Sequence, residues 1–273
     1  MPLHPDQSYV HSETGLELID THCHLDLEPL AAHLPQVLAA ARQAGVSRFV
    51  VPGVHPDGWK RIMALAAANH GILAAVGIHP MHAALADDDA LSELAGLAAN
   101  CVAIGEIGLD PTYFVPLKTQ EAAFREQLRL AGSHGLPVLV HCRRAFQVTL
   151  QLLREEKACH AGGIMHAFSG SPEMAREFIR LGFAISLSGT LTWHNAVRPL
   201  RLAREIPLAH LVLETDAPDM PPQNHRGEAN QPAWLAEVQL ALAAAKNVTP
   251  EAVAAATRDN TARILGLAGE RNV

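Results

Sequence analysis

LIDTHCHLD, residues 18–26, is a short apolar stretch that leads directly into His22 and His24. The pattern predicts a buried β-strand followed by two histidines on one face, because alternate residues of an extended chain project to the same side. Two neutral imidazoles on one face form a natural pair of metal ligands. The stretch therefore predicts a strand that delivers a metal site at its end.

The same arrangement, a short apolar run that leads into a polar or small residue, recurs along the chain. The expected strands cover residues 18–21, 48–54, 72–78, 102–107, 137–140, 163–165, 183–187 and 210–214. Amphipathic stretches predict helices at approximately 30–44, 57–70, 87–99, 119–134, 145–157, 172–181, 195–205 and 231–246, with a last one at 249–265. Eight strand–helix units in series favour the α/β class and a closed (β/α)₈ TIM barrel, with a doubly wound open sheet as the alternative.

Length and composition agree with one globular domain. The chain has 273 residues, of which 49 % are apolar and 18 % charged, so wholesale disorder is excluded. We expect a loose N-terminal arm at 1–17 and a single barrel domain at 18–273. No apolar run reaches the ~18 residues of a membrane span and no secretory signal is visible, which favours a cytoplasmic protein without membrane contact.

Charge and cysteine content limit the kind of ligand and the cellular compartment that we expect. The net charge of −7, with 21 Lys and Arg, argues against a broad basic surface that wraps a long nucleic acid, although a small positive pocket is compatible with it. The cysteines stand far apart in the sequence, which favours reduced thiols in a cytosolic protein. They are Cys23, Cys101, Cys142 and Cys159.

Residues able to bind a metal stand at the ends of several expected strands. The carboxyl ends of barrel strands converge on one mouth, where the active site of this fold lies. Besides His22 and His24, these residues are His79, Glu106, His141, His166 and Asp216. In a closed barrel the last strand adjoins the first, so Asp216 can complete a site with the two histidines. His141 and His166, from neighbouring strands, can hold a second ion.

Glu106 lies in VAIGEIGL, residues 102–109, an almost wholly apolar run. An unpaired buried carboxylate costs several kcal/mol, and one metal ion, or two ions bridged by its oxygens, would remove that cost. Two ions roughly 3.5–4 Å apart activate a water and clamp a phosphoryl or acyl oxygen. Imidazole and carboxylate ligands suit Zn, Mn, Fe, Co or Ni, and Mg less well, so the metal stays open.

Three further carboxylates lie beside these candidates. Asp20 and Asp26 are expected to orient the histidines, as outer carboxylates do in many metal sites. Glu214, two residues before Asp216, has either an ion-pair or supporting role or a direct one. Arg143, Arg144 and Arg226 would add positive charge to a metal-loaded site, which would then attract an anion such as a phosphodiester.

Ordered segments of the chain resemble the TatD family of metal-dependent deoxyribonucleases. They are IDTHCHLD (19–26), VGIHP (76–80), IGEIGLD (104–110), PVLVHCR (137–143), HAFSGS (166–171) and LVLETDAP (211–218). The run NTARILGL at 260–267 also looks like the family's usual ending. His141-Cys142-Arg143-Arg144 and ETDAPDM at 214–220 resemble a less studied subgroup of the family.

The resemblance implies an amidohydrolase-like TIM barrel with two divalent metal ions. One ion would be held by His22, His24, Glu106 and Asp216, and the other by Glu106, His141 and His166, with Glu106 bridging. Family members hydrolyse DNA, often from the 3′ end of single strands. The departures from the family pattern, at 111–113, at 142–144 and at Ala167, fall at the mouth and touch none of the expected ligands.

The sequence thus predicts a hydrolase acting on ester bonds, a TatD-type 3′–5′ exonuclease for single-stranded DNA that uses a metal-activated water. Asp216 would serve as general base and Glu106 as the other catalytic residue, while His79, Arg143 and Arg144 would bind the substrate phosphate. The expected partner is DNA or a small phosphodiester, and no obligate protein partner is evident. An amidohydrolase or lactonase on the same barrel is the alternative. A non-catalytic metal-binding protein is disfavoured, because purely structural metal sites are closed by protein ligands.

Overall fold

The computed structural model describes residues 17–158 and 161–267. Eight parallel strands pair in chain order from β1 to β8. The strands are β1 (Leu18–Asp20), β2 (Val46–Pro52), β3 (Ile72–Val76), β4 (Ala103–Leu109), β5 (Val138–Cys142), β6 (Gly163–Met165), β7 (Phe183–Leu187) and β8 (Leu211–Leu213). A doubly wound sheet would break this order at a switch point, so the open-sheet alternative is wrong and the (β/α)₈ barrel is confirmed.

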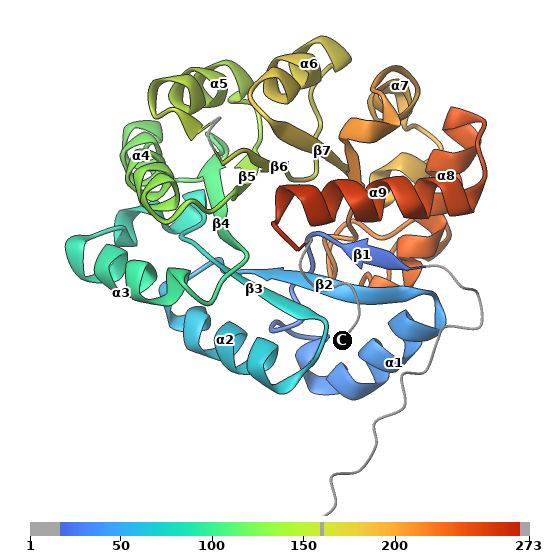
Figure 1. Cartoon of the computed structure of the whole chain (residues 1–273), viewed down its shortest axis with the longest axis horizontal. Helices are drawn as coiled ribbons and strands as arrows, with labels where there is room; N and C mark the ends of the chain where they lie inside the picture. Colours follow the sequence, from blue (N-terminus) through green and yellow to red (C-terminus); the bar gives the residue numbers. More distant parts are fainter. Residues whose placement is uncertain (1–16, 159–160, 268–273) are drawn as a thin grey trace, which may run out of the picture.

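The helices alternate with the strands and lie outside them, as Figure 1 shows, with α9 crossing one end of the barrel. They are α1 (Leu34–Gln43), α2 (Trp59–Ala68), α3 (Asp88–Ala98), α4 (Leu117–His134), α5 (Phe146–Glu155), α6 (Pro172–Arg180), α7 (Val197–Glu205), α8 (Leu235–Lys246) and α9 (Pro250–Ile264). Among the described residues, none of the helices combines the length and the hydrophobicity that crossing a bilayer requires.

The start of α9 follows its local capping signal, whereas α1 begins later than its pattern predicts. Thr249 accepts a hydrogen bond from the backbone N–H of Ala252, and Pro250 occupies the first turn of α9, as the sequence predicts. α1 begins later than expected, at Leu34, because residues 31–33 form a separate 3₁₀ turn before it.

The first and last strands meet through a short seam. Cys23 and Ala217 form a parallel bridge just beyond β1 and β8. The backbone N–H of Asp216 donates to the carbonyl of His22 at 2.9 Å. The seam closes the barrel and brings two of the expected ligands together, although they stand far apart in the sequence.

The base of the barrel is filled by an apolar layer. One residue from each of β2 to β8, together with Leu265 after α9, forms a buried cluster separate from the core under the helices. Side chains from so many strands can meet only inside the barrel. The strand members are Val50, Ala75, Ala103, Leu139, Ile164, Ala184 and Val212.

β4 carries an irregularity that decides where Glu106 points. Its pairing with β5 shifts register between Ile104 and Ile107. Both isoleucines face the helices, whereas Ala103 faces the barrel interior. An extra residue between the two isoleucines changes the alternation of sides, as a bulge does. Glu106 consequently turns inward, and its N–H donates to the carbonyl of Gly53 at 2.9 Å.

The bulge depends on glycine. A Cβ on Gly105 would lie 2.5 Å from the Cβ of Leu139, so β4 and β5 are too close there for any side chain. Gly108 has a φ of +148°. A Cβ at that position would lie 1.9 Å from the carbonyl oxygen of His141. Glycine at both positions lets β4 carry a buried carboxylate close against β5.

Some of the sequence predictions concern residues outside those that the structure describes. The N-terminal arm expected at 1–17 lies, apart from Glu17, outside the described residues, as does Cys159. The division into an arm at 1–17 and a single domain at 18–273 therefore stays a prediction. Within the described residues, Cys23, Cys101 and Cys142 are buried and form no disulfide.

Candidate metal centre

Imidazoles and carboxylates from most strands gather at the carboxyl end of the barrel. Each lies at or just beyond a strand end, except Glu106, which lies within β4. All are buried apart from His141, which is half-buried. The group consists of His22, His24, His79, Glu106, His141, His166 and Asp216.

Glu106 lies between two sets of histidines. Its Oε2 is 3.2 Å from Nε2 of His22 and 4.0 Å from Nε2 of His24. Its Oε1 is 2.9 Å from Nδ1 of His141 and 3.5 Å from Nε2 of His79. Each carboxylate oxygen therefore faces its own set of imidazole nitrogens, which is the arrangement that a bridging carboxylate requires.

Asp216 completes the group from β8. Its Oδ1 lies 3.6 Å from Nε2 of His166, 3.7 Å from Nε2 of His22 and 3.8 Å from Nε2 of His24. The Asp216 backbone has a positive φ of 58°. The sequence prediction that Asp216 meets the two β1 histidines across the seam agrees with this geometry.

Three sets of side chains place their ligand atoms within 4.8 Å of one another. They are His22, His166 and Asp216; His22, His24 and Glu106; and His79, Glu106 and His141. This division differs from the expected one in two respects. His166 stacks on His22, with ring centroids 3.5 Å apart, and its centroid is 6.2 Å from that of His141. His79, expected to bind phosphate, lies beside His141, with ring centroids 4.6 Å apart.

The donor atoms suit a divalent cation. Both ring nitrogens of His22 and Nδ1 of His24 are buried and make no hydrogen bond to any residue that the structure describes. Unsatisfied buried polar atoms are rare and call for a partner. Imidazole nitrogens and carboxylate oxygens are ligands for Zn, Mn, Fe, Co and Ni. The residues present therefore fit a metal ion, and the assignment of each ligand to an ion stays a prediction.

The protonation states favour metal binding. Burial lowers the pKa of His22 to about 4 and that of His79 to about 3, so both imidazoles are neutral at neutral pH and offer a lone pair. Burial alone would raise the pKa of Glu106. The histidines around it, His22, His79 and His166, hold that pKa well below its usual range, so Glu106 is a carboxylate.

The other half of the site attracts positive charge. Burial raises the pKa of Asp216 well above its usual range, and the neighbouring carboxylates of Glu214 and Glu106 add to the effect. For His166, burial lowers the pKa, but Glu214, Asp216 and Glu106 outweigh it and raise the pKa to about 10. In both cases several carboxylates share a dry space, where a cation is strongly favoured.

A family model described as TatD related DNase matches residues 19–266. The chain belongs to the TatD family. It is 37 % identical over 250 residues to the uncharacterized metal-dependent hydrolase YabD of Bacillus subtilis, which covers 90 % of this chain and 98 % of YabD. The crystal structure of YjjV, a TatD homolog from Escherichia coli, superimposes with a TM-score of 0.87 at 35 % identity, covering 90 % of this chain and 97 % of YjjV. A TatD family hydrolase from Entamoeba histolytica shares the fold, with a TM-score of 0.83 at 21 % identity.

These similarities confirm the family that the sequence motifs indicate. This TatD family member is a metal-dependent hydrolase on a TIM barrel, with side-chain clusters that can hold metal ions.

Two carboxylates stand behind the histidines of the TatD site. Oδ2 of Asp110 is 3.2 Å from Nε2 of His141. Oε2 of Glu214 is 3.1 Å from Nδ1 of His166, and its Oε1 accepts a hydrogen bond from the N–H of Ala167 at 2.6 Å. Such outer carboxylates fix the ring orientation of metal-binding histidines. Glu214 therefore contacts the ring of a candidate ligand, and Asp110, in IGEIGLD (104–110), makes the same kind of contact, which no sequence pattern indicated.

Asp20 and Asp26 act differently from the expectation. Asp20 is fully buried and accepts hydrogen bonds from the backbone N–H of Thr215, at 2.9 Å, and of His22, at 3.3 Å. Asp26 pairs with Arg61 at 2.8 Å. Within the part of the chain that the structure describes, neither carboxylate forms a hydrogen bond to an imidazole ring. Asp20 instead secures the backbone across the seam.

The arginines expected at the mouth are available to a ligand in different degrees. Arg143 and Arg144 follow β5 and are exposed, and neither guanidinium forms an ion pair within the described part of the chain. Arg226 packs over the ring of Trp193, with its guanidinium carbon 4.1 Å from the centroid. The pair after β5 can therefore engage an anion without first breaking an ion pair.

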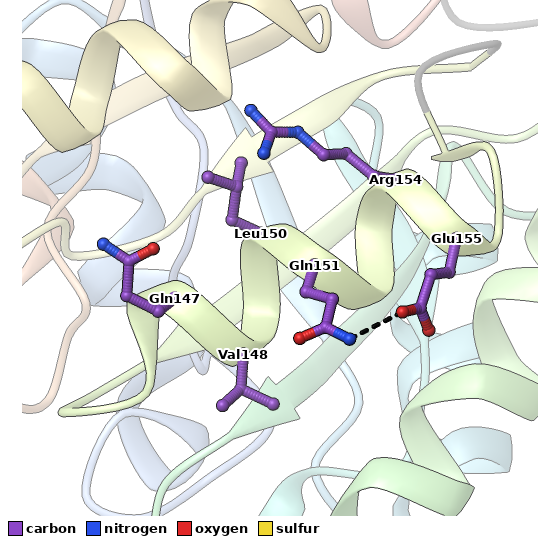
Figure 2. Close-up of a pocket in the computed structure, with 6 residues that line it drawn as sticks. All are labelled: Gln147, Val148, Leu150, Gln151, Arg154 and Glu155. Atoms are coloured by element: carbon purple, nitrogen blue, oxygen red, sulfur yellow. Dashed lines mark hydrogen bonds between the residues drawn. The ribbon is translucent and has the colours of Figure 1, made fainter.

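A surface hollow elsewhere on the TatD barrel takes no part in this site. It has a volume of about 320 Å³ and runs along α5, where Gln151 and Glu155 point toward each other (Figure 2). Its lining residues include none of the metal-binding candidates. They are Gln147, Val148, Leu150, Gln151, Arg154 and Glu155.

Proposed function

We propose that this TatD family hydrolase cleaves phosphodiester bonds in DNA, removing nucleotides from the 3′ end of single strands. The observation that carries the proposal is the position of Glu106, whose two oxygens face separate sets of imidazoles. A carboxylate in that position suits two neighbouring divalent metal ions. Two metal ions held in this way bind the oxygens of a phosphoryl group. The description of the matching family as a DNase supports the same substrate class.

Charge favours a phosphodiester over a neutral substrate. In a metal-loaded site the imidazoles would be neutral ligands, so Glu106 and Asp216 would supply the negative charge of the donor set. Two divalent ions would exceed that charge and leave the loaded site positive. Arg143 and Arg144 add unpaired positive charge at the same mouth. Such a site binds an anionic ester more strongly than an amide or a lactone.

The side chains can be given roles from their exposure and contacts. Bound divalent ions would supply a water of lowered pKa and would neutralise charge on the phosphoryl oxygens. The Asp216 side chain retains 12 % exposure against 4 % for Glu106, so Asp216 is the carboxylate that a water can reach. We assign Asp216 the role of general base and Glu106 that of a fixed bridge. Arg143 and Arg144 position the phosphate.

The test compares substrate classes on purified protein. Single-stranded oligonucleotides labelled at the 5′ or the 3′ end, bis-p-nitrophenyl phosphate, N-acyl amides and lactones are each assayed with Mg, Mn, Zn, Co or Ni and with chelator. We expect stepwise shortening of the 5′-labelled strand, lost with chelator and with Asp216→Asn. A phosphorothioate at the last 3′ linkage should slow the first step.

Other products would contradict parts of the proposal. Turnover of amides or lactones without any phosphodiester cleavage would place the enzyme in the amidohydrolase or lactonase class. Release of label from the 5′ end in single nucleotides would reverse the polarity. Equal activity in Asp216→Asn would remove Asp216 from the chemistry.

A further inference from the structure

Phe114 is a fully exposed aromatic side chain in the segment that joins β4 to α4. Large apolar side chains are normally buried because contact with water is unfavourable. The other exposed large apolar residues of the described chain are not aromatic, and their exposed fractions lie between 36 % and 71 %. They are Leu27, Met81, Leu85, Val197, Leu240 and Val248.

The segment that carries Phe114 is held firmly at both ends. The buried side chain of Gln120 accepts a hydrogen bond from the Asp110 N–H at 2.8 Å and donates to the carbonyls of Asp110, at 3.0 Å, and Val115, at 2.9 Å. The Asp110 carboxylate accepts from the N–H of Thr112 at 2.9 Å. Phe114 is therefore displayed on a fixed turn, which lowers the entropy lost when a ligand packs on it.

The same turn borders the metal centre. The ring of Tyr113, next to Phe114 in the chain, meets His79 edge-on with centroids 5.5 Å apart and lies 6.5 Å from the ring centroid of His141. Arg143 is close enough for its charge to act on the Tyr113 phenol. The exposed ring of Phe114 thus follows directly in the chain on a tyrosine that contacts His79 and feels the charge of Arg143.

This combination fits a nucleobase better than a protein partner. Bases that lack a pairing partner stack on exposed aromatic rings, while a neighbouring cation takes the phosphate. A stable protein interface buries about 800 Å² on each partner, far more than one phenyl ring supplies. A base within a duplex would already be stacked on its neighbours, so the ring selects a single strand.

We propose that Phe114 is a stacking platform for an unpaired base next to the phosphodiester that is cleaved. The inference rests on the proposed function and names the substrate more closely, as a strand with an unpaired base at a fixed distance from the metal centre. Phe114 touches the substrate away from the reacting atoms, so it sets affinity and strand preference rather than the rate of the chemical step.

The test moves an abasic residue through the substrate. A series of single-stranded oligonucleotides carries one abasic site at successive positions near the 3′ end. KM is measured for wild type, Phe114→Ala, Phe114→Trp and Leu240→Ala, the last a control on α8 that is also exposed. Affinity is measured separately, by fluorescence anisotropy of the same strands in the Asp216→Asn background.

We expect wild type to bind one member of the series roughly tenfold more weakly than the intact strand, which is the effect of losing one stacked base. Phe114→Ala should bind the intact strand as weakly as wild type binds that abasic strand. The variant should bind the intact and the abasic strand with the same affinity, and its kcat should be unchanged. Phe114→Trp should restore the discrimination, and Leu240→Ala should behave as wild type.

The result that overturns the inference is a Phe114→Ala variant with the abasic profile of wild type. A changed oligomeric state with an unchanged profile would overturn it too, and would assign Phe114 to a contact between copies of the chain. If no strand is hydrolysed but binding still depends on Phe114 and on one base, the cleavage proposal fails and the platform stands. If strands are hydrolysed but no abasic position changes the affinity, the cleavage proposal stands and the stacking proposal fails.

Discussion

The two ends of the barrel interior differ in every chemical respect although the same strands build both. At the base, Leu139 and Ile164 belong to an apolar layer. Two residues further along the same strands, His141 and His166 face the carboxylate of Glu106. Successive inward-facing residues of one strand therefore change from an apolar side chain to a candidate metal ligand.

The difference separates stability from chemistry. Burial of the base layer removes apolar surface from water and stabilises the fold. The mouth buries carboxylates and imidazoles with unsatisfied atoms, which costs free energy unless a cation is bound. We therefore expect substitutions at the base to change stability and substitutions at the mouth to change metal content and turnover.

The largest effect should come from the mouth. Asp216→Asn keeps the size of the side chain but removes the carboxylate that we assign as general base, so kcat on the oligonucleotide should fall about 10²- to 10⁴-fold. Thermal unfolding followed by circular dichroism should show an intact fold, and metal content should be measured on the same sample. Turnover near that of wild type would contradict the assignment of the chemistry to the residues at the mouth.

The matching change at the base is Ile164→Ala, two residues before His166 on the same strand. Ile164 is 1 % exposed, and its truncation should lower the free energy of unfolding by about 2–5 kcal/mol through lost burial and the cavity left behind. Urea unfolding measures this, with metal content and kcat at low temperature as the readouts that should not change. His166→Ala, in contrast, should lose metal. Equal metal binding in both variants would contradict the division between a stabilising base and a metal-binding mouth.

Removal of metal should lower stability to a smaller extent. A ligand that binds only the folded state adds about 2.7 kcal/mol at 100 times its Kd, so dialysis against chelator should lower the Tm of wild type by several degrees. The magnitude depends on the free metal concentration, which is varied to test the linkage. A Glu106→Ala variant should show little response, and a full response in that variant would contradict the place of Glu106 in the site.

The smallest effect concerns a contact at the edge of the mouth. Trp59 is fully buried, and its indole N–H donates to the carbonyl of Gly77 at 2.9 Å. Trp59→Phe should cost about 1 kcal/mol, the net value of one hydrogen bond, with added cost from the smaller ring. Urea unfolding gives the value, and kcat should stay within a factor of a few. A large fall in kcat would show that strand spacing and chemistry are coupled here.

Much of the fold was predictable because its signal is local. Each strand is a short apolar run and each helix carries an amphipathic period, and the bounds of β6 and β7 agree with the expectation at both ends. Ligand residues at strand ends were predictable for the same reason, since the barrel directs every strand end to one mouth.

Glu106 shows what strict alternation alone would miss. Counted from Ala103, an unbroken strand would turn residue 106 toward the helices, and only the register shift between Ile104 and Ile107 turns it inward. Nothing in a single sequence marks that shift except the glycines at 105 and 108. The contacts of Asp110 and His79 were missed because they depend on side-chain positions across neighbouring strands.

The seam between β1 and β8 also has a consequence for synthesis of the protein. His22 stands near the beginning of the chain and Asp216 near its end, and they meet only where the last strand joins the first. On the ribosome, a nascent chain that has not yet released β8 lacks this carboxylate and the closing bridge of the barrel. A fragment that ends before β8 is therefore made without the residue that we assign as general base.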